Sequence, residues 1–478
     1  MGPATDDPEI LERVVKAGVD VVRLNFSPGD AETHKRRAQM IREIARKFER
    51  HVGILVDLQG PKIRVARFKG EGKVFLQEGA RFDLDVSLDP DAGDATHVGC
   101  SYESLPRDLK PSDTLLLDDG RIVLGVDRIE GPRVICHVLV GGELSNHKGI
   151  NKQGGGLSAA ALTEKDKQDI KTAVEIDADY MAISFPRTAA DVQEARTLLK
   201  AAGGDAGIVS KIERAEALEA GAIEAIIDAS DAIMVARGDL GVEIGDAHLP
   251  RVQKDLIKLA RARNRVVITA TQMMESMIYN PLPTRAEVFD VANAVIDGTD
   301  AVMLSAETAS GKYPDKAVEA MDRVCRQAEK YPRTRHSDHR IDEAFGRIDE
   351  AIAMSAMYIA NHLPVRLIGA LTETGSTPLW MSRISSGIPI FALTSHEKTC
   401  RRVTLLRGVY PISFNEKGIS DHAVLNRAIV EEFLKRELVT HDDMVILTKG
   451  DLTGLTGGTN ALKITRVSDV LAAAPNPT

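Results

Sequence analysis

The sequence predicts an α/β protein: a (β/α)8 TIM barrel with an inserted small β-barrel lid domain and a C-terminal open α/β domain. Short, nearly all-apolar runs alternate with amphipathic segments, which is typical of repeated βα units around a parallel sheet buried on both faces. This alternation stops between residues 61 and 156, where short strands and turns replace the helices. A second α/β series begins after residue 332. These three observations define the fold class.

The barrel is predicted from residues 1–60 and 157–331. From residue 180 onward the apolar runs recur about every 25–35 residues, which is the length of a βα unit. Only seven strands are found where a closed barrel has eight, so the first strand is missing. The seven strands are expected at Val21–Leu24, Ile54–Leu58, Tyr180–Ser184, Ile208–Lys211, Ala232–Ala236, Val266–Ala270 and Ala301–Ser305.

Residues 61–156 predict the lid, because short strands and frequent turns occur there without helical periodicity. They follow the second barrel strand directly, so the lid is expected above the carboxyl-end rim of the barrel. Residues 332–478 predict the C-terminal regulatory domain, with helices at Asp342–Asn361 and His422–Arg436. Its five strands are expected at Val365–Leu371, Ile390–Thr394, Val409–Ile412, Met444–Thr448 and Ala461–Val467.

Composition excludes several classes of protein. The chain has 61 basic and 70 acidic residues, a net charge of −9, which argues against a nucleic-acid or anionic-membrane partner. No apolar run approaches the length of about 18 residues that would cross a bilayer. The four cysteines are far apart and lack metal-site spacing, so we expect reduced thiols in a cytoplasmic protein.

Charged and hydroxyl residues gather at the ends of six predicted barrel strands. In barrels of this class the catalytic groups come from the carboxyl ends of several strands. Arg23, Asn25 and Ser27 are spaced to point the same way in an extended chain, and so are Lys211 and Glu213. The remaining members are Asp57, Lys62, Arg64, Gly238, Asp239, Thr271, Ser305 and Glu307.

This set of residues favours metal-dependent phosphoryl transfer. Glu213 and Asp239 offer two hard oxygen ligands, which suit Mg²⁺. Lys211, Arg23 and Arg64 add the positive charge that a transferring phosphoryl group requires. The sequence contains no Walker A motif and no protein-kinase motif set. Each residue alone could instead belong to a rim ion pair or a helix cap. Met273, Met274 and Met277 are expected in the core.

Nearly the whole chain resembles pyruvate kinase. The resemblance is carried by GPAT at residues 2–5, AGVDVVRLNFS, DLQGPKIR, SKIER, VARGDLGVEI, ATQMMESM, PTRAEVFDVANAVIDGTDAVMLSAETA and TKGD, in that order. It implies transfer of phosphate from phosphoenolpyruvate to ADP, giving pyruvate and ATP, with Mg²⁺ or Mn²⁺ as cofactor. It also implies the barrel, lid and regulatory domain described above, usually in a homotetramer.

The resemblance also implies roles for individual residues. Lys211 would stabilise the transferring phosphoryl group, Arg23 would contact the substrate phosphate, and Glu213 and Asp239 would bind Mg²⁺. The amides of Gly238 and Asp239 would receive the substrate carboxylate. Thr271, Ser305 and Glu307 would lie where enolpyruvate is protonated. Nucleotide contacts would come from Asn25, Arg64 and Lys148, and the K⁺ site of potassium-dependent members would correspond to Asn25, Ser27 and Asp57.

Two departures from the family pattern lead to further expectations. Many potassium-dependent members have Asp-Thr followed by Gly-Pro-Glu, whereas this chain has Asp57-Leu58 followed by Gly-Pro-Lys62. The ammonium of Lys62 would bring its own positive charge near the K⁺ site, so it is expected to replace K⁺. The Gly-Pro-Lys sequence also makes the chain resemble the bacterial group of the family that contains it. The family also has a strand just before GPAT, so the native chain is expected to begin upstream of Met1.

Two hydroxyl- and glycine-rich loops in the C-terminal domain predict an effector site. Such turns after parallel strands present backbone N–H groups to phosphate, and the family uses them for phosphorylated effectors. The first loop has no Lys or Arg, which favours a sugar monophosphate or AMP over a bisphosphate. Its residues are Thr372, Thr374, Gly375, Ser376 and Thr377, and the second loop spans residues 448–460.

Two other functions fit part of the pattern. A carbon–carbon lyase of the phosphoenolpyruvate/pyruvate barrel group would also use carboxylate-held Mg²⁺ to stabilise an enolate. A lyase needs no second phosphate clamp, so the lid with Lys148 and the C-terminal domain argue against it. A non-enzymatic scaffold is disfavoured because every charged catalytic position is occupied.

Overall fold

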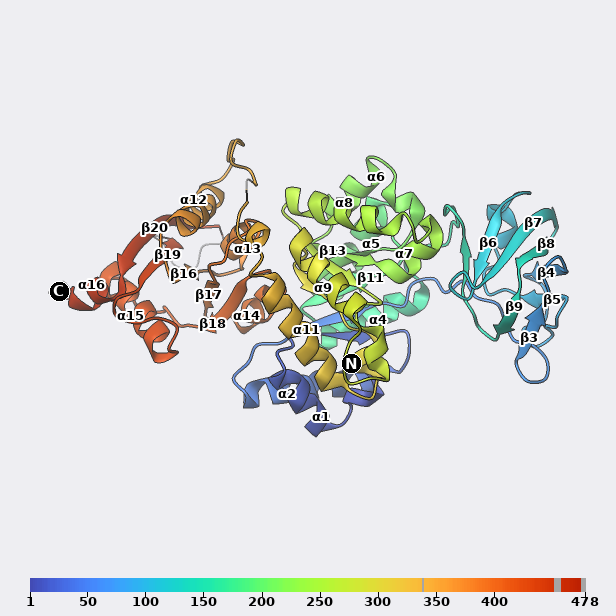
Figure 1. Cartoon of the computed structure of the whole chain (residues 1–478), viewed down its shortest axis with the longest axis horizontal. Helices are drawn as coiled ribbons and strands as arrows, with labels where there is room; N and C mark the ends of the chain where they lie inside the picture. The colour runs from blue at the N-terminus through green and yellow to red at the C-terminus, as the bar shows by residue number, and fades with distance from the viewer. Residues whose placement is uncertain (338, 451–456, 474–478) are drawn as a thin grey trace.

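The computed structural model describes residues 1–337, 339–450 and 457–473. The C-terminal domain, the barrel and the lid follow one another along the long axis of the molecule (Figure 1). Among the described residues, no helix combines the length and apolar character needed to cross a bilayer.

Seven parallel strands form the barrel sheet, in the order β1-β2-β11-β12-β13-β14-β15. Within the described residues β1 and β15 are not paired with each other, so the sheet curls without closing. All seven predicted strands are confirmed, although β15 is shorter than expected because the chain turns away after Val302. Their bounds are β1 Val21–Asn25, β2 Gly53–Asp57, β11 Tyr180–Ile183, β12 Gly207–Ile212, β13 Ala232–Ala236, β14 Val266–Ala270 and β15 Ala301–Val302.

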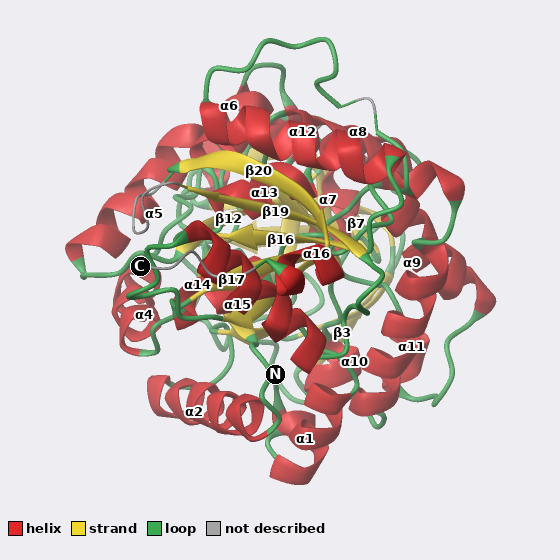
Figure 2. Cartoon of the chain, turned by 90° about the vertical axis from the view of Figure 1, so that its left-hand side faces the viewer, coloured by secondary structure: helices red, strands yellow, loops and turns green. Residues whose placement is uncertain are grey.

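A ring of helices surrounds this sheet (Figure 2). Local sequence fixes several of their starts: Thr163 and Asp166 form a capping box for α4, Thr284 and Glu287 one for α9, and Pro314 opens α11. The ring consists of α1 Pro8–Lys16, α2 Ala31–Lys47, α4 Glu164–Glu175, α5 Ala189–Ala201, α6 Ala222–Ala229, α8 Leu249–Ala262, α9 Arg285–Asp297 and α11 Pro314–Ala328.

The lid is all-β apart from the short helix α3 (Leu105–Asp108). It has its own hydrophobic core, separate from that of the barrel. A six-stranded sheet, β10-β6-β7-β8-β4-β5, lies beside the two-stranded sheet β3-β9. Their bounds are β3 Lys73–Leu76, β4 Arg81–Asp85, β5 His97–Gly99, β6 Thr114–Leu117, β7 Ile122–Glu130, β8 Arg133–Val140, β9 Gly142–Ser145 and β10 Ile150–Lys152.

The chain returns from the lid to the barrel through three consecutive glycines. Gly154, Gly155 and Gly156 have φ values of 79°, 78° and 97°, a region that other residues adopt only at a cost. A Cβ on Gly155 would lie 2.0 Å from the carboxylate of Glu216, so this position has no room for a side chain unless Glu216 moves. The return segment therefore depends on glycine both for its backbone shape and for close packing on the barrel.

The C-terminal domain contains an open five-stranded sheet in the order β18-β17-β16-β19-β20. The first four strands are parallel and β20 is antiparallel to β19. The bounds are β16 Leu367–Leu371, β17 Ile390–Thr394, β18 Val409–Ser413, β19 Met444–Gly450, β20 Thr459–Arg466, α12 Ile348–His362, α13 Ser376–Ser382, α14 Glu397–Val403, α15 His422–Lys435 and α16 Val467–Ala472.

One predicted helix start in this domain is wrong. The helix expected from Asp342 begins at Ile348 instead. Arg340 has a left-handed φ of 60°, and Gly346 is a poor helix former, so the preceding segment is a series of turns.

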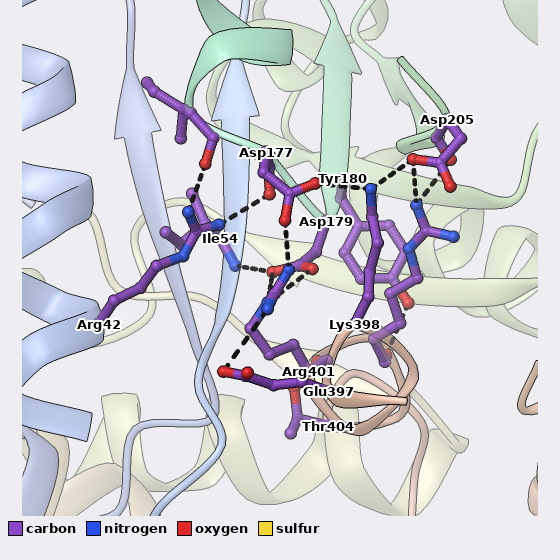
Figure 3. Close-up of polar contacts among 12 residues, drawn as sticks. Arg42, Ile54, Asp177, Asp179, Tyr180, Asp205, Glu397, Lys398, Arg401 and Thr404 are labelled. Atoms are coloured by element: carbon purple, nitrogen blue, oxygen red, sulfur yellow. Dashed lines mark hydrogen bonds and ion pairs between the residues drawn. The ribbon is translucent and has the colours of Figure 1, made fainter. Parts of the chain in front are cut away.

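Ion pairs from α14 fix the C-terminal domain to the amino-terminal end of the barrel (Figure 3). Arg401 lies 3.0 Å from Asp179 and 2.8 Å from Asp177, and Lys398 lies 2.7 Å from Asp177. Asp179 is fully buried and also accepts a 2.9 Å hydrogen bond from the backbone N–H of Ile54. Beside these pairs, side chains of the barrel strands and of the C-terminal domain form one continuous hydrophobic cluster.

Candidate active site

A cavity of about 270 Å³ lies at the carboxyl ends of the barrel strands, beneath the lid. Most of the predicted site residues line it, from both the barrel and the chain segment that leads into the lid. These are Arg23, Asn25, Ser27, Asp57, Leu58, Lys62, Arg64, Lys211, Glu213 and Asp239. The carboxyl ends of the barrel strands lie at one face, and there residues from β1, β2, β12 and the start of α7 (Arg237–Ile244) come together.

Lys211 is the cation at the floor of the cavity. Its Nζ lies 2.9 Å from Glu213 Oε1 and 3.5 Å from Asp57 Oδ1, and it donates a 2.9 Å hydrogen bond to Ser184 Oγ. Burial alone would lower the pKa of Lys211, but the two carboxylates outweigh it and hold that pKa above its ordinary value. The ammonium is therefore charged and held in place.

Asp57 pairs with two cations at once. Arg23 donates to Asp57 Oδ2 through Nε at 2.7 Å and Nη2 at 2.6 Å. Burial would raise the pKa of Asp57, but Lys211 and Arg23 together hold it below its ordinary value. Its second oxygen, Oδ1, is buried without a hydrogen-bond donor in the described structure. This oxygen could accept a further cation.

Glu213 and Asp239 fit a divalent cation. Burial, opposed by Lys211 and reinforced by Asp239, raises the pKa of Glu213 to about 7. Burial likewise raises the pKa of Asp239. Two carboxylates desolvated beside each other are stabilised by a shared cation. Mg²⁺ is commonly bound through one or two carboxylates, with water and substrate oxygens as its other ligands.

Thr271 lies outside the cavity lining and is hydrogen-bonded to Gly238, the residue before Asp239 of the lining. Its Oγ1 accepts a 2.8 Å hydrogen bond from the N–H of Gly238. Thr271 and Gln272 both have left-handed φ values, 66° and 56°, which are uncommon for residues other than glycine and especially so for the β-branched Thr271. Arg237 donates to the carbonyl of Thr271 through Nη2 at 2.6 Å and so stabilises this backbone. Gly238 lies in the first turn of α7.

Three further predicted residues, besides Thr271 and Gly238, do not line the cavity in this structure. The buried carboxylate of Glu307 accepts hydrogen bonds from the N–H groups of Ser305 at 2.6 Å and Met274 at 3.2 Å. Both of its oxygens are therefore bound to the backbone. Ser305 is the residue before the short helix α10 (Ala306–Ala309). Lys148 of the lid pairs with Asp118 at 2.7 Å. The three core methionines are fully buried, as expected.

Lys62 and Arg64 line the same cavity from the segment leading into the lid. Burial first, and then the neighbouring charges of Arg64 and Lys165, lower the pKa of Lys62. No ion pair of Lys62 is found within the described part of the chain. The structure therefore brings its ammonium to the cavity without fixing it on a carboxylate.

Sequence reasoning missed several lining residues. Ser184 and Phe185 follow β11 directly, and the N–H of Phe185 donates to Glu213 Oε2 at 2.9 Å. Ser184 could have been predicted, because it is a hydroxyl residue at the carboxyl end of an apolar run, where the other site residues were found. Glu243 lies four residues after Asp239, on the same face of α7, and helical spacing was the available signal. Asp119 comes from a lid turn that no local pattern connects with the barrel.

The first predicted effector loop is only partly open to a ligand. The hydroxyl of Thr372 accepts a 2.9 Å hydrogen bond from the N–H of Gly375, and Thr374 is exposed. Thr377 is buried and its hydroxyl lies 2.9 Å from that of Thr459. Ser376 is half-buried. Most of the second loop, residues 451–456, lies outside the described residues.

Comparisons with known proteins identify the family to which the chain belongs. The family model described as "Pyruvate kinase, barrel domain" matches residues 1–318, and "Pyruvate kinase, alpha/beta domain" matches residues 350–465. The chain is 57% identical to "Pyruvate kinase II" of Salmonella typhimurium (strain LT2), covering 98% of this chain and 97% of the relative. It is 54% identical to "Pyruvate kinase" of Haemophilus influenzae, covering 94% of each. A crystal structure of a pyruvate kinase from Cryptosporidium parvum superposes with a TM-score of 0.90 at 35% identity, covering 98% of this chain and 94% of that one.

Proposed function

Because the chain belongs to the pyruvate kinase family, we propose that its cavity binds phosphoenolpyruvate and ADP and transfers the phosphoryl group from the first to the second. The products are pyruvate and ATP, and the enzyme is a phosphotransferase. The observation that carries this assignment is the ammonium of Lys211, held between Asp57 and Glu213 beside Arg23. The lyase alternative is not favoured, since the relatives that match over nearly the full length are pyruvate kinases.

The charged residues of the cavity divide into phosphate and nucleotide contacts. Lys211 and Arg23 both lie next to Asp57. Their donors would hold the phosphoryl group as its charge spreads during transfer. Glu213 and Asp239 would hold Mg²⁺ or Mn²⁺, which when bound neutralises phosphate and carboxylate oxygens. Asn25, Arg64 and Lys148 would contact the nucleotide. Lys148 would have to leave Asp118 to do so, which a closing lid would allow.

Thr271 would act after the transfer, when enolpyruvate takes up a proton. Its hydroxyl donates to the carbonyl of Ala270 at 2.7 Å and accepts from the N–H of Gly238. These two hydrogen bonds fix the orientation of the hydroxyl group. The amides of Gly238 and Asp239, at the start of α7, would receive the substrate carboxylate. Ser305 and Glu307 would support this region by shaping the backbone near Met274 rather than by touching substrate.

A coupled assay tests the assignment. The purified chain, phosphoenolpyruvate, ADP and Mg²⁺ are combined with lactate dehydrogenase and NADH, and pyruvate formation is followed by absorbance. We expect turnover that requires all three additions. Release of pyruvate from phosphoenolpyruvate without ADP, or formation of a new carbon–carbon bond, would contradict phosphoryl transfer to a nucleotide.

Activity is expected to be independent of K⁺, because Lys62 brings a positive charge to the cavity that contains Asp57 Oδ1, an oxygen without a hydrogen-bond donor among the described residues. Lys62→Glu should create a requirement for K⁺, with turnover restored by added KCl. The measurement is the initial rate in K⁺-free and K⁺-containing buffers of equal ionic strength. Lys69→Glu, at an exposed lid position outside the cavity lining, is the matched control. Strong activation of the unmodified enzyme by K⁺ would show that Lys62 does not replace the ion.

The loop at residues 371–378 is proposed to bind a phosphorylated effector. Thr374 and Ser376 present hydroxyls there, and no Lys or Arg lies in the loop, so a single phosphate group is favoured. Thr372→Glu should abolish activation by ribose 5-phosphate or AMP, since it adds a negative charge and breaks the turn to Gly375. Activation is read from the substrate concentration at half-maximal rate. Activation by fructose 1,6-bisphosphate alone would refute the preference for a monophosphate.

A homotetramer is proposed from two exposed apolar faces. One face, on the barrel, includes Tyr279, Leu282 and Phe289, which are 69%, 70% and 75% exposed. The other, on the C-terminal domain, includes Ile348 and Tyr358, which are 68% and 59% exposed. If each face pairs with the same face of another subunit, the two kinds of interface together produce a closed tetramer with dihedral symmetry. Light scattering should give four times the chain mass of 51.8 kDa, and a monomer would refute the arrangement.

A cytoplasmic location is also proposed. All four cysteines are free thiols in the structure, as expected for a reducing compartment. A disulfide found in the protein purified from its own cells would contradict this location.

A further inference from the structure

A second cavity, of about 520 Å³, lies between the barrel and the C-terminal domain. It shares no lining residue with the cavity of about 270 Å³ described above. The end of α11 and the turn at Pro332–Thr334 form one wall, and residues 382–390 form the opposite wall. Met357 of α12 and Tyr410 of β18 also line it. A volume of roughly 300–1,000 Å³ is typical of small-molecule sites.

Hydrogen bonds hold both walls in place. Arg261 donates to the carbonyl of Arg383 at 2.6 Å and to Ser385 Oγ at 3.3 Å, which ties the second wall to the barrel. On the first wall, Thr334 Oγ1 donates to the carbonyls of Glu329 at 2.8 Å and Tyr331 at 2.7 Å. The cavity is therefore preformed and does not depend on a free loop.

Positive charge predominates in this cavity. Four cationic side chains line it and only one carboxylate, that of Glu329. Arg326 is already paired with Asp322 at 2.7 Å, and Arg407 donates to the carbonyl of Val295 at 2.7 Å. The other two, Lys330 and Arg335, have no ion-pair partner among the described residues. These two donors are available to an anion.

The rest of the lining contains both apolar and uncharged polar side chains, and the apolar ones are grouped. Ile384, Ile388, Pro389 and Ile390 come from the second wall, and Met357 is buried behind them. We propose that this cavity binds a small organic anion that carries one phosphate or carboxylate group on an apolar or aromatic body. The anionic group would lie against Lys330 and Arg335, and the body would pack on the isoleucines and Pro389.

Two simple probes test the proposal on the full-length enzyme. Phenyl phosphate and benzoate share an aromatic body and differ in their anionic group, so calorimetric titration of each identifies the group that the site prefers. Benzylamine carries a positive charge on a similar body and should not bind. We expect saturable binding of at least one anion with a Kd of about 1 mM or tighter.

Charge reversal then locates the site. Lys330→Glu and Arg335→Glu should each weaken binding about tenfold or more, because each removes a charge-assisted contact and adds repulsion. Arg333→Glu is the matched control, since Arg333 is exposed in the same turn but does not line the cavity. It should bind the probe as the unmodified enzyme does. Equal binding by all three variants would overturn the proposal, as would the absence of saturable binding up to about 10 mM.

A steric variant provides a second test. A Cβ at Gly387 would lie 3.4 Å from Arg335 Cδ, which is ordinary contact distance and points toward the basic wall. Gly387→Trp should therefore fill the cavity and abolish probe binding, while phosphoryl transfer and the thermal unfolding midpoint stay close to those of the unmodified enzyme. Retained binding in this variant would place the anion elsewhere.

Discussion

Replacing Lys211 by methionine is expected to lower turnover about 100- to 1,000-fold, the usual effect of removing one preorganised electrostatic group from a transition state. Lys211 is the only side chain seen to contact both Asp57 and Glu213 among the described residues, and methionine keeps its length without its charge. The measurement is the maximal rate in the coupled assay at saturating phosphoenolpyruvate, ADP and Mg²⁺.

Lys254→Met is the control for this substitution. It removes another lysine that is paired with a carboxylate, Asp297 at 2.6 Å, but on α8 and outside the cavity lining. Its rate should stay within a few-fold of the unmodified enzyme, on the general behaviour of surface ion pairs. Near-normal turnover of Lys211→Met, in a protein that circular dichroism shows to be folded, would contradict a role for Lys211 in stabilising the transition state.

Arg383→Met is expected to lower the free energy of unfolding by about 3–5 kcal/mol, because it leaves a buried carboxylate without its cation. Arg383 and Asp300 are both 0% exposed in their side chains. Arg383 Nη1 lies 3.0 Å from Asp300 Oδ2 and 2.8 Å from the carbonyl of Arg265, so the pair joins the C-terminal domain to the barrel. Urea unfolding followed by far-ultraviolet circular dichroism measures the loss.

A double variant separates the charge effect from lost packing. Arg383→Met with Asp300→Asn should recover part of the stability, because no uncompensated charge is left and the amide oxygen can still accept from Val267. A loss below about 1 kcal/mol in Arg383→Met would mean that Asp300 finds another cation or water on relaxation.

Much of the fold follows from local sequence. All seven barrel strands and all five C-terminal strands were predicted. Eleven of them are parallel strands, which are short apolar runs that local composition reveals, whereas β20 is antiparallel and partly exposed. Arg23, Lys211 and Glu213 meet in one cavity because a parallel barrel brings all carboxyl ends of its strands to one side. The boundary of α12 was harder to predict, since a left-handed residue at Arg340 leaves no compositional signal.

The direction of side chains beyond the strand ends could not be predicted in the same way. Glu307 follows a strand, as Glu213 does, yet its carboxylate turns to the N–H groups of Ser305 and Met274. Backbone donors in irregular segments decide this, and they are fixed only when the chain has folded. Asp119 enters the cavity from the lid for a similar reason, since its position depends on tertiary packing.

The hydrophobic cluster shared by the barrel and the C-terminal domain lies close to the cavity at the strand ends. Val209 of β12 belongs to that cluster, whereas Lys211, two residues further on, lies at the floor of the active site. Two residues of strand span only about 7 Å. An effector bound as proposed to the C-terminal domain would therefore need no relay through the barrel helices, because the interdomain core and Lys211 lie on the same short strand.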